Sequence, residues 1–198
     1  KGLNLGYPTR VQGSSTLLLQ DCAPNAQHVK LVFPARDNMP KVAMPEVEVH
    51  WYDGGMMPDR PEGFPQGKEL MGEGGGLCIF HGTKDTLICG CYGVNPWLLS
   101  GRKPNVPQTL RRVKDAMKGG HEQDWIRACK ESAGSRVQTK SNFLEAGPFN
   151  EMVVMGVLAV RLQRLNKELL WDGPNMRFTN IDPNETIKII KKDTFEVI

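Results

Sequence analysis

The sequence predicts an α+β fold, a mostly antiparallel and open β-sheet with helices packed on one face. Two observations support this prediction. The first half of the 198 residues contains short β-rich runs bounded by Pro, Gly, Asn or Asp, whereas the second half contains longer helical patterns. Strands followed by helices, without regular alternation, favour an α+β layout over a doubly wound parallel sheet. We expect residues 1–198 to form a single domain.

Three β-rich runs open the chain, at residues 11–19, 29–33 and 46–52. In the third run, apolar and polar residues alternate from Val47 to Tyr52, which is the period of a half-buried strand. A stretch rich in Gly and Pro follows at residues 54–76. Because it is too long for a hairpin turn, we expect an ordered surface excursion or a lid there.

Residues 77–80 and 87–92 are predicted to form a hairpin centred on Thr83 and Lys84. This centre gives the following pairs: Phe80 with Leu87, and Cys78 with Cys89. Both faces of the hairpin are apolar, so both must be covered. Helices can cover one face, and the other favours contact with a second subunit.

The second half of the chain contains two predicted helices. Residues 121–133 form a short helix closed by Gly134, and residues 148–167 form a longer one with Pro148 at its first position. Apolar residues surround most of the longer helix, which predicts that it is largely buried. Gly156 in its middle costs about 1 kcal/mol relative to Ala, and a close approach to the sheet would compensate.

Short elements end the chain. Residues 169–172 and 176–179 are strand-like, and residues 183–190 are predicted to form a closing helical turn or short helix.

Composition excludes several classes of protein. The net charge of +3 is mild and the basic residues are scattered, so we expect no nucleic-acid partner. The longest apolar run, residues 152–162, is too short to span a bilayer and contains Arg161, so we expect no membrane partner. The five cysteines do not make a disulfide scaffold. The compartment stays open between a reducing one and export of a protein that does not depend on disulfides, and any export signal would lie upstream of Lys1.

The glycines and cysteines do not predict a cofactor or metal site. The glycine-rich residues 72–76 precede a strand, whereas a phosphate cradle links a strand to a helix. Cys78, Cys89 and Cys91 could share one face and begin a zinc site, but His81 falls on the opposite face. We interpret the three as core residues, with a Cys78–Cys89 disulfide as an alternative in an exported protein.

Two segments of the sequence contain side chains that could contact a substrate. Where the third strand runs into the glycine-rich excursion, ionisable and aromatic residues are adjacent and could form the rim of a pocket. His121 opens a helix, and a helix N-terminus favours anionic or hydrogen-bonding ligands. The candidate substrate contacts are therefore His50, Trp51, Tyr52, Asp53 and His121. The alternative for each is a structural role in capping or packing.

The order of several segments resembles a known family of bacterial oxidoreductases. The segments are LGYPTRV at 5–11, VHWYDGG at 49–55, MPDRP at 57–61, GTKDTL at 82–87, CGCYG at 89–93, AGPFNE at 146–151, LWD at 170–172 and RFTN at 177–180. In this combination and order they resemble the C-terminal domain of the glucose–fructose oxidoreductase/inositol dehydrogenase/rhizopine-catabolism (Gfo/Idh/MocA) family. The resemblance extends over essentially the whole chain.

The resemblance implies a substrate-binding and oligomerisation domain beside an N-terminal Rossmann domain of the same parent chain. Members of the family bind NAD or NADP, act mostly on sugars, polyols and their derivatives, and commonly pair subunits through the open face of the sheet. We therefore expect a homo-oligomer that binds a sugar-like small molecule.

The family's defining residues have no counterpart here. The glycine fingerprint, the Glu-Lys-Pro segment with its catalytic lysine, and the Asp-x-x-x-His helix would all lie upstream of Lys1. We therefore assign no catalytic or cofactor-binding residue, and expect this chain alone to bind no NAD or NADP and to be inactive. Two alternatives stay open: the same domain of an NAD-dependent glycoside hydrolase, and a non-catalytic binding or scaffold domain.

Overall fold

The computed structural model describes residues 3, 5–19, 22–37, 44–70, 76–107, 113–115, 118–182 and 184. The chain divides into two units, a larger one of residues 1–57 and 113–198 and a smaller one of residues 58–112. The predicted closing helix at 183–190 lies outside the described residues apart from Asn184.

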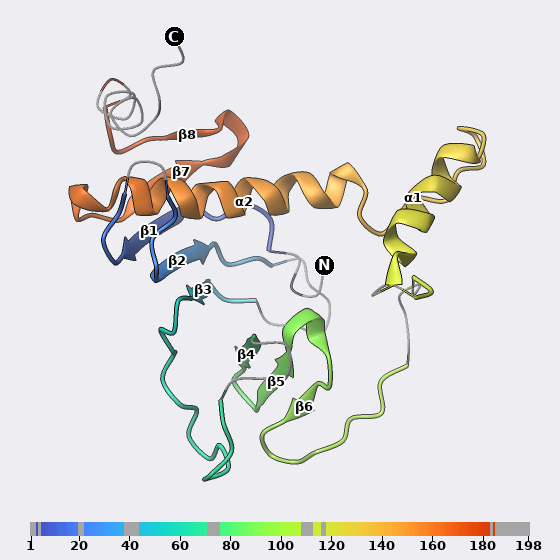
Figure 1. The fold of residues 1–198 in the computed structure, drawn as a ribbon, viewed down its shortest axis with the longest axis horizontal. Helices are drawn as coiled ribbons and strands as arrows, with labels where there is room; N and C mark the ends of the chain where they lie inside the picture. The colour runs from blue at the N-terminus through green and yellow to red at the C-terminus, as the bar shows by residue number, and fades with distance from the viewer. Residues whose placement is uncertain are drawn as a thin grey trace. The chain divides into compact units, whose positions relative to one another are not determined.

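The larger unit contains a five-stranded sheet in the order β3-β2-β1-β7-β8, in which every neighbouring pair is antiparallel (Figure 1). Its strands are β1 (Arg10–Ser15), β2 (Gln27–Phe33), β3 (Val47–Tyr52), β7 (Leu169–Asp172) and β8 (Arg177–Phe178). Its helices are α1 (Gly120–Lys130) and α2 (Phe143–Arg161), with 3-10 turns η4 (Gln163–Leu165) and η5 (Gly173–Asn175). The predicted α+β fold with an antiparallel sheet is confirmed.

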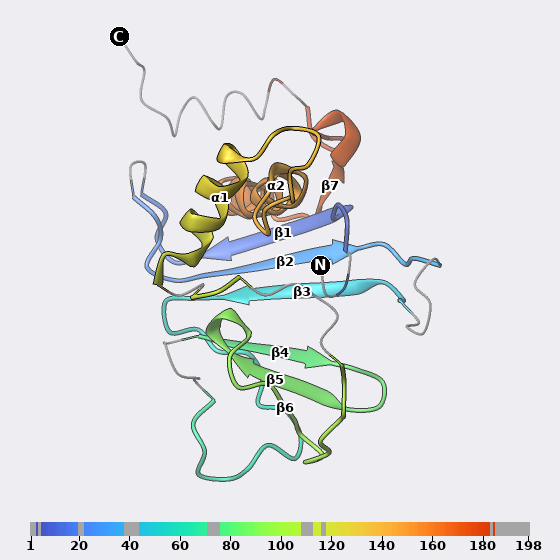
Figure 2. The ribbon, with the colours of Figure 1, turned by 90° about the vertical axis from the view of Figure 1, so that its right-hand side faces the viewer.

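The helix α2 crosses one face of this sheet, as both ribbon views show (Figures 1 and 2). On that face Val11 pairs with Leu31, and Gly13 pairs with Val29. Leu31 and Val29 pair in turn with residues of β3. The core between the helix and the sheet consists of Val11, Val29, Leu31, Phe33, Met155, Ala159, Val160, Leu162 and Leu169. Alternation along each strand places mostly polar residues on the opposite face, together with the buried Val32.

Gly13 allows α2 to lie directly on β1. A Cβ atom at Gly13 would be 2.7 Å from the backbone nitrogen of Val160 and 2.8 Å from the carbonyl carbon of Ala159. At Gly156 of the helix, a Cβ atom would meet only the methyl groups of Val29, at 3.5 and 3.7 Å. Gly156 does face the sheet as expected, but the contact that requires a glycine is at Gly13.

Two predictions about α2 are wrong. The helix begins at Phe143 rather than at Pro148, which lies inside it. Asn142 starts the helix instead, since its carbonyl oxygen accepts the first helical hydrogen bonds. The helix is also not largely buried: among the described residues only Met155, Gly156, Ala159 and Val160 of α2 are buried, because the sheet covers a single side.

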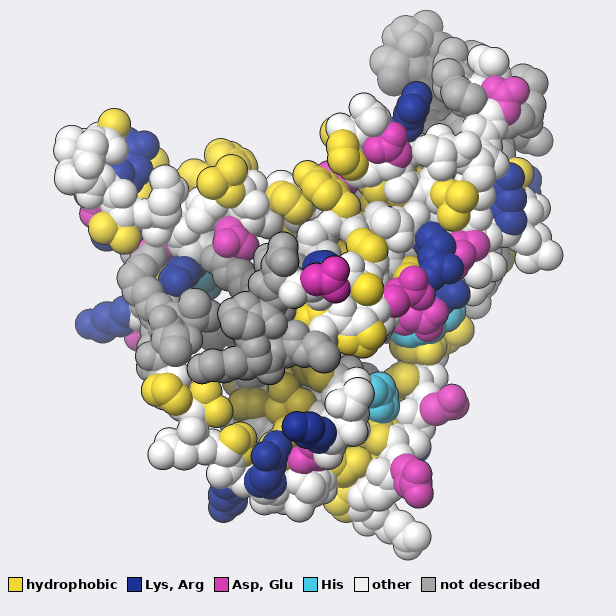
Figure 3. All heavy atoms as spheres, turned by 180° about the vertical axis from the view of Figure 1, so that it is seen from behind, with side chains coloured by type: hydrophobic (Ala, Val, Ile, Leu, Met, Phe, Trp, Pro, Cys, Tyr) yellow, Lys and Arg dark blue, Asp and Glu magenta, His cyan; other side chains and the backbone are white. Residues whose placement is uncertain are grey.

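The other side of α2 exposes apolar residues. Phe149 is 63% exposed, and Val153, Val154 and Val157 are each about half exposed. Figure 3 shows hydrophobic side chains at the surface over this helix. By length and composition alone α2 is apolar enough to cross a membrane, with a mean hydropathy of 1.4, but core helices of folded domains meet the same criterion. Its buried contacts with β1 and β2 favour a core helix.

The smaller unit is a three-stranded antiparallel sheet in the order β4-β5-β6, with strands β4 (Leu77–His81), β5 (Thr86–Gly90) and β6 (Trp97–Leu98). The predicted hairpin register is confirmed, with Cys78 opposite Cys89 and Phe80 opposite Leu87. The strand β6, which was not predicted, adds a second neighbour to β5, whose Ile88 is buried. The described residues of this unit contain no α-helix.

The cysteines of the hairpin are free thiols. Cys89 is buried and Cys78 is exposed. Burial raises the pKa of the Cys89 thiol, and the neighbouring Cys78 raises it further. Cys91 lies in the 3-10 turn η2 (Cys91–Gly93) beyond β5, so it does not continue the strand face as predicted. Within the described part of the chain, no three His, Cys, Asp or Glu side chains converge as metal ligands.

Other predicted bounds shift by a few residues. The first strand ends at Ser15 instead of residue 19, and α1 ends at Lys130 instead of residue 133. The stretch from Asp53 to Leu70 consists of turns and irregular segments without helix or strand, as expected for a surface excursion.

Gly13→Ala is expected to destabilise the larger unit by about 3 kcal/mol, because the added methyl group would overlap backbone atoms of α2. Gly156→Ala is the matched control: it fits beside Val29 and gains helix propensity, so it should be neutral or stabilise by up to about 1 kcal/mol. Urea unfolding followed by circular dichroism measures both changes. Equal destabilisation by the two substitutions would contradict the close contact at Gly13.

Candidate functional site

The sheet face opposite α2 carries a continuous set of charged and imidazole side chains, here called the open-face network. It consists of Glu46, Arg10, Glu168, Lys30, Glu48, His50 and His28, in order of contact. Figure 3 shows basic, acidic and histidine side chains next to one another on one part of the surface. The network follows from strand alternation, because residues 10, 30, 48 and 50 share a face in the observed register.

Ion pairs form one end of the network. The Arg10 guanidinium lies 2.6 Å from Glu46 Oε1 and 3.4 Å from Glu168 Oε2. The Lys30 ammonium lies 3.3 Å from the other oxygen of Glu168 and 3.9 Å from Glu48. Because these side chains are partly exposed, each pair contributes little to stability, roughly 0–1 kcal/mol.

Two imidazoles form the other end. His50 Nε2 lies 3.2 Å from Glu48 Oε2, and His50 Nδ1 lies 3.0 Å from His28 Nε2. The Tyr52 ring stacks on His28 with centroids 4.5 Å apart and planes 18° apart. The hydrogen bond with His50 lowers the pKa of Glu48, so this carboxylate is ionised at neutral pH. Burial, and then the proximity of His50 and Lys30, lowers the pKa of His28 and favours its neutral form.

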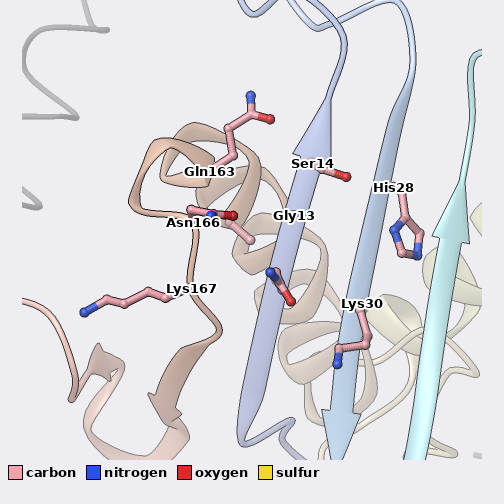
Figure 4. A pocket seen from close by; sticks show the side chains of 9 residues that line it. Gly13, Ser14, His28, Lys30, Gln163, Asn166 and Lys167 are labelled. Atoms are coloured by element: carbon pink, nitrogen blue, oxygen red, sulfur yellow. The ribbon is translucent and has the colours of Figure 1, made fainter.

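A hollow of about 470 Å³ lies beside this imidazole end (Figure 4). It opens where β1 continues past β7, because β7 pairs only with Arg10 and Val11. Its lining comes from β1, β2 and the end of α2 with the turn after it: Gln12, Gly13, Ser14, His28, Lys30, Ala159, Gln163, Asn166 and Lys167. The lining is therefore rich in amide, hydroxyl, imidazole and ammonium groups.

Gln163 closes the exposed edge of β1 at this hollow. Its Oε1 accepts a hydrogen bond from the Ser15 backbone nitrogen at 2.9 Å, and its Nε2 donates to Ser15 Oγ at 2.8 Å. The side chain thus replaces the neighbouring strand that β1 lacks here, and it satisfies a backbone donor at a sheet edge.

The predicted candidates separate into two groups. His50 and Tyr52 belong to the open face, and both contact His28 at the hollow. Trp51 pairs with Val29 and so lies on the opposite face, where it is 59% exposed. Asp53 follows β3 and accepts hydrogen bonds from Trp51 Nε1, the Gln27 backbone and Gln27 Nε2, at 2.9 to 3.0 Å. The geometry gives Asp53 a structural role at the strand end.

His121 lies in the first turn of α1, is exposed, and shares no hydrogen bond or ring contact with residues 50–53 in the described part of the chain. Its neighbours in that turn are structural. Asp124 is buried and accepts hydrogen bonds from Arg127 and from the Lys140 backbone. Trp125 donates to Ser141 Oγ at 2.7 Å and contacts Phe143 edge to face, which joins α1 to the start of α2.

None of the residues that line the hollow was a candidate from the sequence, and Glu48 was missed as well. His28 precedes the predicted strand 29–33, and no motif distinguishes it from a lone surface histidine. The signal that identifies His28 and Lys30 is cross-strand register, since Lys30 stands opposite His50 and His28 stands opposite Tyr52. Glu48 shares a face with His50 through alternation along β3.

A second hollow, of about 540 Å³, lies between the start of the chain and the turn after β7. Tyr7, Pro8, Pro34, Trp171 and Pro174 give it mostly apolar walls. The hollow at His28 offers more hydrogen-bonding groups, and two predicted candidates adjoin it, so we take it as the candidate site.

No model of a known protein family matches this chain, and no functionally curated protein is similar to it. The sequence pattern and the geometry of the site are therefore the basis for the function proposed below.

Asp53→Asn is expected to lower the free energy of unfolding by about 1 kcal/mol at neutral pH, because charge-assisted hydrogen bonds weaken. Burial raises the pKa of Asp53, but hydrogen bonds from Trp51 and Gln27 outweigh it, and the pKa lies below its ordinary value of 3.8. A carboxyl whose pKa is lower in the folded than in the unfolded state stabilises the fold at pH values above its ordinary pKa. This contribution is lost as the pH falls through the folded-state pKa.

Urea titrations of the two proteins should therefore differ most at about pH 7, and the difference should shrink as the pH falls below the ordinary pKa of 3.8. Glu62→Gln, at an exposed position in the smaller unit, serves as the control. A difference that persisted unchanged at low pH would contradict the role of the ionised Asp53 carboxylate.

Proposed function

We propose that this chain is the substrate-side and oligomerisation domain of an NAD(P)-dependent oxidoreductase that acts on a sugar, a polyol or a derivative of one. The observation that carries the proposal is an open antiparallel sheet with α2 on one face and a polar, histidine-containing face opposite. It agrees with the architecture that the segment resemblance implies. The partner in this proposal is an N-terminal Rossmann domain of the same parent chain.

The described residues do not fit a dinucleotide site of their own. Such a site needs a glycine-rich loop between a strand and the N-terminus of a helix. In the described part of the chain α1 and α2 follow irregular segments instead, and no strand leads through such a loop into either helix. The proposal therefore assigns NAD or NADP to the other half of the parent and no cofactor contact to this chain.

The hollow at His28 supports a sugar-like ligand. Sugars and polyols present many hydroxyl groups, each a donor and an acceptor, and suit a lining of amide, hydroxyl and imidazole groups. Lys30 is engaged with Glu168, and the Lys167 ammonium donates to the Asn180 carbonyl at 2.6 Å. Lys30 is thus charge-compensated and the Lys167 ammonium is held by a carbonyl group, and the amide, hydroxyl and imidazole groups that make up the rest of the lining suit a neutral ligand.

The open-face network supports subunit pairing. It alternates cationic and anionic groups across three strands, so a second copy placed face to face can match opposite charges. The proposal assigns pairing to this charged surface and the ligand to the hollow at its imidazole end.

The isolated chain is expected to give no saturable energy transfer from tryptophan to NADH or NADPH up to about 1 mM cofactor. The intact parent should show saturable transfer and should oxidise a sugar or polyol. Fluorescence titration measures the first and absorbance of the reduced nicotinamide the second. Tight cofactor binding by the isolated chain would overturn the division of roles proposed here.

Lys30→Glu is expected to weaken self-association of the chain about tenfold, equivalent to about 1.4 kcal/mol, because it reverses the central charge of the open-face network. Lys84→Glu makes the same charge change at the exposed β4–β5 turn of the smaller unit and should leave association unchanged. Sedimentation equilibrium compares the variants after circular dichroism has shown that each is folded. An unchanged dimer constant in Lys30→Glu would contradict pairing through this face.

A further inference from the structure

When both histidines are neutral, the contact with ionised Glu48 determines the direction of the hydrogen bonds that connect Glu48 to His28. The ionised Glu48 carboxylate can only accept, so the His50 Nε2 facing it at 3.2 Å must carry a proton. In neutral His50 the other nitrogen, Nδ1, is then unprotonated and accepts. His28 Nε2 lies 3.0 Å from this nitrogen and must therefore donate. Neutral His28 is left with an unprotonated Nδ1.

That remaining nitrogen faces the hollow. In the close view one ring nitrogen of His28 is turned toward β3 and the other toward the β2 side, beyond which Ser14 of β1 stands opposite His28 (Figure 4). Since Nε2 contacts His50 of β3, the nitrogen on the side away from β3, toward the other lining residues of the hollow, is Nδ1. Stacking of Tyr52 on the His28 ring opposes rotation of the imidazole out of this plane.

We propose that Glu48 and His50 position His28 so that its Nδ1 accepts a hydrogen bond from a hydroxyl group of a neutral polyhydroxylated ligand bound in the hollow. Glu48 and His50 act through His28 and are positioning residues, whereas His28 contacts the ligand. No bond is broken when the ligand hydroxyl donates to Nδ1. The hydrogen-bonded series Glu48–His50–His28 is called the relay below, and each of its protons stays on its own nitrogen.

Neighbouring side chains fit such a ligand. Gln12, Ser14 and Asn166 line the hollow, and their side chains make no hydrogen bond to another described residue. They supply donors as well as acceptors beside the His28 acceptor. A ligand with several hydroxyl groups can satisfy this mixed set, whereas a single anion would face the His28 lone pair.

Charged groups from several elements surround the two imidazoles. Lys30 of β2 and Glu48 of β3 face them on the sheet, Arg10 and Glu168 follow along the network, and Lys167 lies across the hollow. If His50 took up a second proton it would donate to His28 Nε2, and His28 would then carry its proton on Nδ1. The hollow-facing acceptor would become a donor.

The inference deepens the proposed function by naming how its ligand is recognised, and it rests on that function for the ligand class. The relay itself is tested separately. In a ¹⁵N-labelled chain near neutral pH, long-range nitrogen–proton spectra should show His28 and His50 each as a single Nε2–H tautomer. A nitrogen–nitrogen coupling across the hydrogen bond should join His28 Nε2 to His50 Nδ1.

Glu48→Ala should abolish the coupling and return both rings to mixed tautomers, whereas Glu62→Ala, in the smaller unit, should leave them unchanged. Loss of the coupling only because the chain unfolds is recognised from the amide spectrum. His50→Ala, which keeps Glu48, provides a second test: the His28 tautomer should become mixed. Absence of the coupling in the folded wild-type chain would overturn the relay.

Titration with sorbitol and with D-glucose tests the ligand. Either should shift the His28 Nδ1 resonance with a Kd of roughly 1–10 mM, while His121 serves as the internal control and stays unchanged. Glu48→Ala should weaken binding about tenfold. Equal shifts at His28 and His121, or no shift at His28, would overturn the ligand assignment. A parent protein that retained this binding but lacked oxidoreductase activity would contradict the proposed function without contradicting the ligand contact at His28.

Discussion

The close contact between Gly13 and the backbone of α2 sets the layout of the larger unit. With no Cβ at Gly13, the helix lies against β1 at the level of Ala159 and Val160. The apolar face of the sheet is buried under a single helix as a result, and core residues on both sides share one cluster. Any side chain at position 13 would have to lift the helix, which would open a void above Val11 and Val29.

Covering one face with α2 leaves the opposite face free to be polar. Residues 28, 30, 48 and 50 face away from the core, so their charges are partly solvated and compensate one another. A sheet of this kind has two distinct surfaces because side chains alternate along each strand. The same alternation that builds the core under α2 therefore builds the candidate site, and the hollow forms where β7 stops pairing with β1.

The parts of the fold that local sequence determines were predicted. The β4–β5 register follows from a short turn, which fixes the pairing of Cys78 with Cys89. The strand at 47–52 and the strand Leu169–Asp172 were recognised from alternation and composition. The start of α2 was not, because the preference of Pro148 for a first helical position competes with a valid start at Asn142. Its exposed apolar side could not be predicted either, since composition does not reveal how many partners a helix has.

The site depends on long-range register, and this explains which of its residues the sequence revealed. His50 and Tyr52 were found because they adjoin aromatic and acidic neighbours along the chain. His28 and Lys30 reach them only through the pairing of β2 with β3, whose connection is too long to fix the register by turn geometry. A shift of that register by one residue would move His50 to the helix side and remove both its contacts. The hydrogen-bond order from Glu48 to His28 is therefore a property of the folded sheet, and no motif in the sequence encodes it.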